Sequence, residues 1–63
     1  MRCYFMRKGH IAGVEILPEG LGDAEAIERA KQLLAERQEQ NVRYDGFEVW
    51  DRARHIYRWP PES

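Results

Sequence analysis

Few side chains in this sequence could carry out a chemical reaction, and they are scattered along the chain. The two histidines, His10 and His55, lack the spaced partners that a catalytic triad or a metal site requires. The one cysteine, Cys3, stands among apolar residues, where a cysteine is more often a small buried side chain than a nucleophile. No glycine-rich loop has the strand–turn–helix context of a phosphate-binding motif. We therefore expect no catalytic residue, no metal and no cofactor, and a protein that is not an enzyme.

Another group of residues near the end of the chain suits binding better than catalysis. Aromatic residues that could stack on bases alternate there with arginines that could contact phosphates, namely Trp50, Tyr57 and Trp59 with Arg52, Arg54 and Arg58. The net charge of −1 opposes this interpretation, because nucleic-acid-binding domains are usually basic. A nucleic-acid-binding module is therefore the alternative hypothesis and is not favoured.

Length and composition limit the remaining possibilities. The 63 residues form a single domain, 1–63, in which folding buries only about 60% of the surface that the unfolded chain exposes. One cysteine cannot form an intramolecular disulfide, so self-association is the remaining way to add stability. The first ten residues lack the apolar core of a signal peptide, and no apolar run is long enough to span a membrane. We expect a cytoplasmic protein with no membrane contact.

The first elements that must position these residues are two strands, at about 2–7 and 11–17. Lys8 and Gly9 lie between them and suit a two-residue hairpin loop. The corresponding register pairs Arg2 with Glu15 and lets the Tyr4 ring cover Gly13. It also predicts a continuously apolar face, which consists of Cys3, Phe5, Ala12, Val14 and Ile16.

A single amphipathic helix is predicted over residues 24–40. Asp23 suits the N-cap, and Asn41 is a plausible end. The apolar residues recur at helical spacing and define one stripe that can face a sheet, made of Ile27, Ala30, Leu33 and Leu34.

A second hairpin follows, with strands at about 46–51 and 54–59. Asp51 suits the first position of a type I turn. With a loop of either two or four residues, Val49 faces Ile56 and Glu48 faces Tyr57, so that Phe47, Val49 and Ile56 form the core face. The opposite face then holds Glu48, Trp50, His55, Tyr57 and Trp59.

These elements predict an α+β fold of the type ββαββ, with a four-stranded antiparallel sheet in the order 2-1-3-4. One helix can cover only one face of such a sheet. The other face would present an apolar and aromatic surface, which consists of Tyr4, Met6, Ile11, Trp50, His55, Tyr57 and Trp59. We expect a homodimer that stacks these faces, unless the Pro60–Pro61 tail covers part of the surface. An unidentified protein partner is also open.

The segment Gly46-Phe-Glu-Val-Trp-Asp51, followed by Arg54-His-Ile-Tyr-Arg58, resembles a group of very short bacterial proteins of unknown function. These proteins begin with an aromatic-rich strand and end in a Val-Trp-Asp hairpin with a basic last strand. They commonly carry glycine after the aspartate, where this chain has Arg52. The resemblance implies no activity. A weaker similarity to small antitoxin domains rests on the strand–strand–helix order alone.

Overall fold

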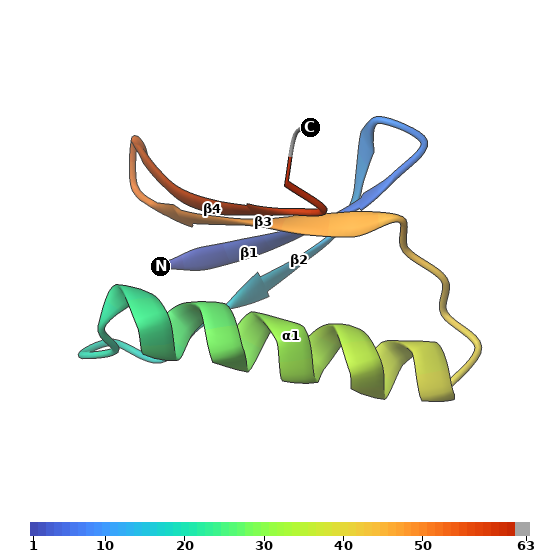
Figure 1. Cartoon of the computed structure of the whole chain (residues 1–63), viewed down its shortest axis with the longest axis horizontal. Helices are drawn as coiled ribbons and strands as arrows, with labels where there is room; N and C mark the ends of the chain where they lie inside the picture. Colours follow the sequence, from blue (N-terminus) through green and yellow to red (C-terminus); the bar gives the residue numbers. More distant parts are fainter. Residues whose placement is uncertain (62–63) are drawn as a thin grey trace.

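The computed structural model describes residues 1–61 and confirms the ββαββ fold (Figure 1). The order of elements is β1 (Arg2–Arg7), β2 (His10–Ile16), α1 (Asp23–Glu39), β3 (Gly46–Asp51) and β4 (Arg54–Trp59). The strand order is β2-β1-β3-β4, as predicted, and every neighbouring pair is antiparallel. Strands β1 and β3 are therefore central, whereas β2 and β4 are the edges.

The helix begins and ends one residue earlier than the predicted range of 24–40. Its N-cap is Gly22, which makes no side-chain capping bond, and Asp23 is the first helical residue. The expectation of an Asp23 cap was therefore wrong, because the Asp23 carboxylate lies 3.3 Å from Arg54 on β4 instead. At the other end Asn41 has φ 64°, and the Val42 N–H donates to the carbonyl of Arg37 at 2.9 Å. This backbone bond is typical of a Schellman stop.

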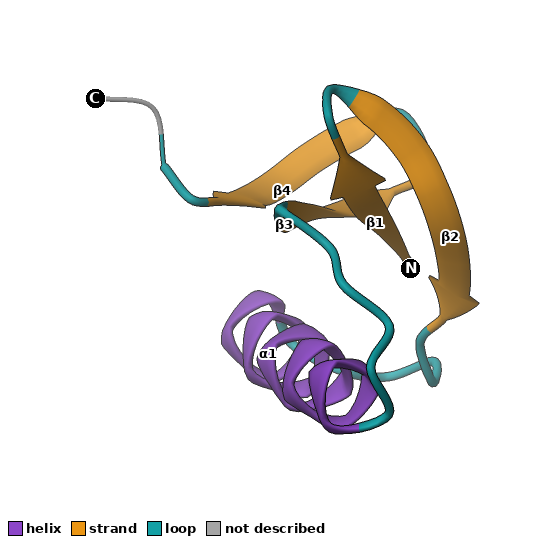
Figure 2. Ribbon diagram, turned by 90° about the vertical axis from the view of Figure 1, so that its right-hand side faces the viewer, coloured by secondary structure: helices purple, strands orange, loops and turns teal. Residues whose placement is uncertain are grey.

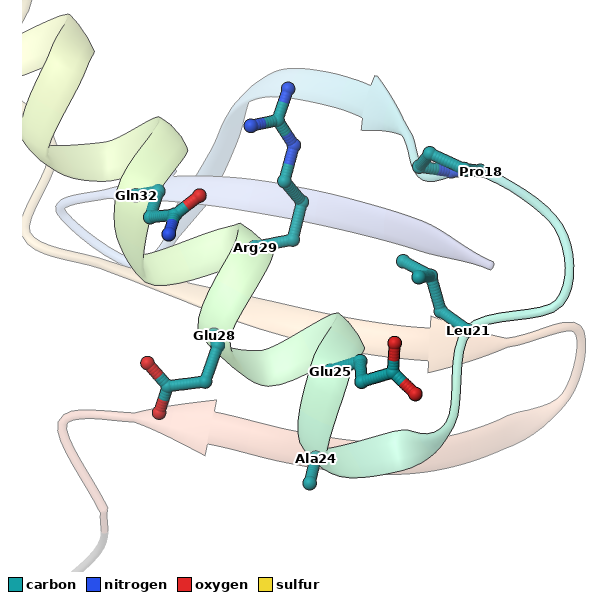
Figure 3. A pocket seen from close by; sticks show the side chains of 7 residues that line it. All are labelled: Pro18, Leu21, Ala24, Glu25, Glu28, Arg29 and Gln32. Atoms are coloured by element: carbon teal, nitrogen blue, oxygen red, sulfur yellow. The ribbon is translucent and has the colours of Figure 1, made fainter.

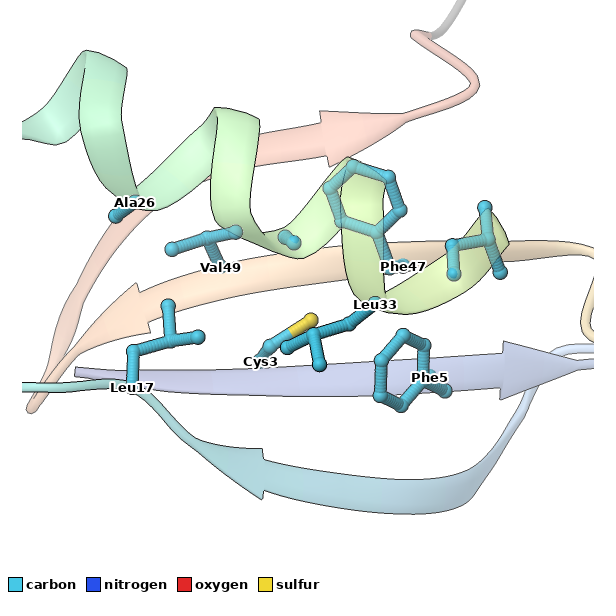
Figure 4. Packing of buried hydrophobic residues seen from close by; sticks show 9 residues of the cluster. Cys3, Phe5, Leu17, Ala26, Leu33, Phe47 and Val49 are labelled. Carbon is cyan, nitrogen blue, oxygen red and sulfur yellow. The ribbon is translucent and has the colours of Figure 1, made fainter. Parts of the chain in front are cut away.

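The core lies between α1 and one face of the sheet (Figure 2). Figure 4 shows the rings of Phe5 and Phe47 and the side chains of Cys3 and Leu17 beneath the helix. The buried hydrophobic residues are Cys3, Phe5, Leu17, Ala26, Ala30, Leu33, Leu34, Phe47 and Val49. The helix presents Ala26 where the sequence predicted Ile27, which is only half-buried.

The first hairpin has the predicted turn but not the predicted register. Lys8 and Gly9 have φ of 52° and 80°, the conformation of a type I′ loop. Beyond Ile11 a β-bulge leaves Ala12 without a partner, so that Phe5 pairs with Gly13 and Tyr4 with Val14. This shift of one residue moves Val14 and Ile16 from the predicted core to the opposite face of the sheet.

The bulge is explained by the side chains that it turns towards the helix. Leu17 becomes 2% exposed. Glu15 contacts Arg37 at 2.6 Å, which replaces the predicted pair with Arg2. Gly13 lies under Tyr44, whose ring stacks on Phe5 with 4.9 Å between centroids. Tyr44, and not Tyr4, therefore covers the glycine, and the shifted register adds aromatic stacking and a cross-layer ion pair.

The second hairpin also contains a bulge, at Ile56. Val49 pairs with Tyr57, and Phe47 pairs with Trp59. The predicted pairs of Val49 with Ile56 and of Glu48 with Tyr57 are therefore wrong. The shift allows the Trp59 ring to stack on Phe47, with centroids 6.1 Å apart, while Ile56 stays half-buried against the core.

The turn between β3 and β4 differs from the predicted type I turn. Its loop has two residues, and the first of them, Arg52, has φ 56°. A type I turn requires negative φ at both central residues. Arg52 thus adopts the left-handed conformation that favours glycine.

Candidate interaction surface

The helix leaves one face of the sheet without cover (Figure 2). Directly paired residues of antiparallel strands point to the same side, so the registers determine which side chains lie there. We call this surface the uncovered face; it consists of Arg2, Tyr4, Met6, Ile11, Val14, Ile16, Glu48, Trp50, His55 and Arg58. Figure 1 shows the two hairpin turns bending away from the helix at opposite ends of the sheet, so that they flank this face.

Most of the predicted surface residues lie on the uncovered face, and two do not. Five of the seven apolar and aromatic candidates are there, namely Tyr4, Met6, Ile11, Trp50 and His55. Tyr57 and Trp59 instead lie on the helix side, where both rings contact Phe47.

The three arginine candidates separate as well. Arg58 lies on the uncovered face, opposite Glu48. Arg52 occupies the turn next to that face. Arg54 points to the helix side, where its guanidinium lies 3.3 Å from Asp23 and 3.4 Å from Asp51. These two carboxylates raise the pKa of Arg54.

Sequence reasoning missed Val14 and Ile16. Both lie on the edge strand β2 in line with Ile11, and their exposed fractions are 51% and 75%, against 60% for Ile11. We call these three residues the aliphatic strip. The signal that could have revealed them is Gly13, because an isolated glycine within a strand pattern often marks a bulge.

Trp50 occupies the middle of the remaining part of the uncovered face. Its indole N–H donates to Oε1 of Glu48 at 3.3 Å, and Nε2 of His55 lies 3.3 Å from the same oxygen. The rings of Trp50 and His55 meet edge to face, with centroids 5.0 Å apart and an interplanar angle of 68°. These contacts fix the orientation of the indole on an open surface.

Shallow hollows lie on both sides of Trp50. The larger, of about 560 Å³, is lined by Trp50 together with His55, Arg58 and Pro61 among others. The smaller, of about 230 Å³, is lined by Trp50 with Met1, Arg2, Tyr4 and Arg52. Each hollow thus combines an arginine with an aromatic ring. Pro61 reaches the larger hollow, so the tail borders this surface.

Charge is divided between the two layers of the molecule. Next to Trp50 stand Arg2, Arg52 and Arg58, with Glu48 as the only acid on the uncovered face. The helix carries more acids than bases, and its acids are Asp23, Glu25, Glu28, Glu36 and Glu39. An anionic partner would therefore be attracted to the sheet side and repelled from the helix side.

Another hollow, of about 420 Å³, lies on the outward side of the helix (Figure 3). Leu21 and Pro18 line one end of it. Figure 3 shows the charged ends of Glu25, Glu28 and Arg29 pointing away from one another. Polar groups that do not converge cannot orient a ligand, so this hollow is a weaker candidate than the surface around Trp50.

The reactive residues that the structure describes do not form a catalytic arrangement. Burial raises the pKa of the Cys3 thiol to about 12, and a thiol of that kind is a poor nucleophile. Within residues 1–61 no group of three or more His, Cys, Asp or Glu side chains could hold a metal ion. The only helix in that range is too short and too polar to cross a membrane.

Comparison with known proteins adds no functional information: no protein-family model, no curated protein and no solved structure matches this chain.

Proposed function

We propose that this protein is a small non-enzymatic interaction domain that self-associates through the aliphatic strip. The observation that carries this proposal is the exposure of Ile11, Val14 and Ile16, which are 60%, 51% and 75% exposed along one edge strand. Solvent-facing positions of an antiparallel sheet are usually polar. A continuous apolar surface on a small domain usually marks an interface.

A second copy of the chain is the partner that fits this strip best. The strip carries no charge, and an uncharged aliphatic surface is complementary to another copy of itself. The domain is also small, with a core of nine buried residues among those described. Association would therefore add buried apolar area that the isolated chain lacks.

The size of the strip predicts a weak dimer. Full burial of an Ile or Val side chain stabilises by about 1.5–3 kcal/mol. In the monomer, roughly half to three quarters of the surface of each residue of the strip is still exposed and could be buried on association. Six such side chains, three from each copy, then contribute about 6–12 kcal/mol. The loss of translational and rotational freedom opposes this by about 4–15 kcal/mol, so a dissociation constant in the micromolar range or weaker is expected.

Sedimentation velocity over roughly 1–500 µM protein tests the proposal, because that range brackets a micromolar dissociation constant. The mass of the wild-type chain should rise towards that of a dimer, and Ile16→Lys should remain a monomer throughout. Val42→Lys is the matched control, since Val42 is 39% exposed but lies beyond the end of the helix. A wild-type chain that stays monomeric, or an Ile16→Lys variant that associates equally well, would contradict the proposal.

A further inference from the structure

We infer that single-stranded nucleic acid binds across Trp50, on the part of the uncovered face that the aliphatic strip does not occupy. We call this part the arginine–aromatic track; it consists of Arg2, Tyr4, Trp50, Arg52, His55 and Arg58. The proposed binding does not depend on self-association, because the strip lies on β2, whereas the track lies on β1, β3, β4 and the turn between β3 and β4.

The rings of the track lie on neighbouring strands. Tyr4 is on the central strand β1, Trp50 on the central strand β3, and His55 on β4 directly opposite Trp50. Adjacent strands are about 4.8 Å apart, so the rings form a short series across the sheet. Unpaired bases can stack on such rings, whatever their sequence, because every base has a flat π-face.

Cations lie on both sides of this series. Arg2 pairs with Trp50 across the two central strands, and Arg52 shares the smaller hollow with them. Arg58 lines the larger hollow with His55. A single-stranded nucleic acid whose bases contact Trp50 would thus have guanidinium groups near its phosphate backbone on both sides of Trp50.

The one carboxylate on the uncovered face, that of Glu48, lies beside the track and is already engaged. Oε1 of Glu48 accepts the hydrogen bond of the Trp50 indole and lies 3.3 Å from Nε2 of His55. Its contacts hold two rings of the track in place. The oxygen that orients the rings is therefore less available to repel a phosphate than a solvated carboxylate would be.

The backbone at Arg52 supports a functional use of that side chain. Its φ of 56° is strained for an arginine, because glycine adopts this conformation readily and, among the other residues, mainly asparagine and aspartate tolerate it. A long cation at such a position costs conformational energy, and strain of this kind is concentrated at sites where the side chain has a function. A glycine there would suit the turn but would remove one of the three arginines.

The two tryptophans allow a direct test, because they lie on opposite faces of the sheet. Trp59→Phe leaves Trp50 as the only indole reporter, and Trp50→Phe leaves Trp59. Each variant is titrated with oligothymidylate of about 15 nucleotides at low salt. We expect fluorescence quenching with Trp59→Phe but not with Trp50→Phe. Anisotropy of a labelled oligonucleotide should show affinity at least about 10-fold weaker for Trp50→Ala, which removes the ring altogether.

A second variant separates loss of binding from loss of folding. Arg52→Gly should fold at least as well as the wild type, because glycine accepts the positive φ. Three phosphate contacts predict a slope of log K against log salt of about −2, and Arg52→Gly should reduce its magnitude by about 0.7. Arg29→Gln, on the helix side, removes one positive charge elsewhere and should leave the slope unchanged.

Three results would overturn the inference: no quenching of the Trp59→Phe variant at low salt, equal binding by Trp50→Ala, or equal affinity for a duplex of the same length. Ile16→Lys should bind the oligonucleotide at least as tightly as the wild type, because the added cation lies next to Arg2. Failure of self-association would therefore leave this inference standing, and failure of binding would leave the proposed dimer standing.

Discussion

The substitution Gly13→Ala tests the shifted register of the first hairpin most directly. A Cβ atom at position 13 would lie 2.9 Å from Oη of Tyr44, closer than real Cβ contacts allow. The Tyr44 ring would have to move off Phe5, with which it stacks at 4.9 Å. In the register predicted from the sequence, by contrast, Gly13 faces Tyr4 on the opposite side of the sheet, and Tyr44 would not respond.

The magnitude follows from two opposing effects. Alanine in place of glycine within a strand ordinarily stabilises by about 0.5–1 kcal/mol, because the unfolded chain loses less freedom on folding. Displacing Tyr44 forfeits the stacking, worth about 0.5–1.5 kcal/mol, together with part of the burial of both rings. We expect Gly13→Ala to lower the free energy of unfolding by about 1 kcal/mol.

The same substitution in a Tyr44→Phe background should have the opposite sign. Without the hydroxyl, the nearest remaining atom of the ring is Cζ at 3.5 Å, an ordinary van der Waals contact. Gly13→Ala should then stabilise by about 0.5 kcal/mol, which gives a coupling energy of about 1.5 kcal/mol between the two positions.

Urea unfolding followed by circular dichroism measures all four members of this cycle. A chain of this size has an m-value of about 1 kcal/mol per molar urea. The shift of the urea midpoint caused by Gly13→Ala should therefore differ by about 1.5 M between the two backgrounds. If Gly13→Ala changes stability equally in both backgrounds, to within about 0.3 kcal/mol, the Tyr44 contact and the bulge at Ala12 are refuted.

Two further predictions concern the core. Gly46→Ala should destabilise the protein by about 2–3 kcal/mol in thermal unfolding, because the added Cβ would meet the backbone carbonyl of Trp59. Gly22→Ala is the control and should cost far less, because only the flexible end of Glu25 lies near its Cβ. Burial raises the pKa of the Cys3 thiol from 9.0 to about 12, so the stability that depends on the protonated thiol is complete below pH 9 and decreases as the pH rises from about 9 to about 12. The difference in unfolding free energy between the wild type and Cys3→Ala should therefore shrink over that range by up to about 1.4 kcal/mol per pH unit, and a difference independent of pH would contradict it.

Local signals in the sequence were enough to predict the elements and their order. Lys8 and Gly9 adopt the turn that their residue types favour, and Asn41 ends the helix in the conformation that asparagine tolerates. The apolar spacing of Ala30, Leu33 and Leu34 placed the buried side of the helix. These features depend on residues within one or two turns of one another, and such short-range preferences can be read from a single chain.

Only the tertiary structure decided which side chains form the candidate surface. The bulges at Ala12 and Ile56 each shift a strand by one residue, and a strand shifted in that way exchanges its two faces. The register of each hairpin depends on contacts with distant segments of the chain. Tyr44 covers Gly13, Arg37 pairs with Glu15, and Phe47 stacks with the Trp59 ring of the last strand.

The existence of a covered and an uncovered face was therefore predicted, but some of the residues on each face were not. Val14 and Ile16 lie on the uncovered face, although the sequence placed them in the core. Tyr57 and Trp59 lie on the helix side instead of the predicted outer face, and Arg58 lies beside Trp50. An alternating pattern determines that two faces exist. Packing against the rest of the molecule determines which of them each residue occupies, because the stacking and burial gained by the shifted register outweigh the ladder bonds lost at a bulge.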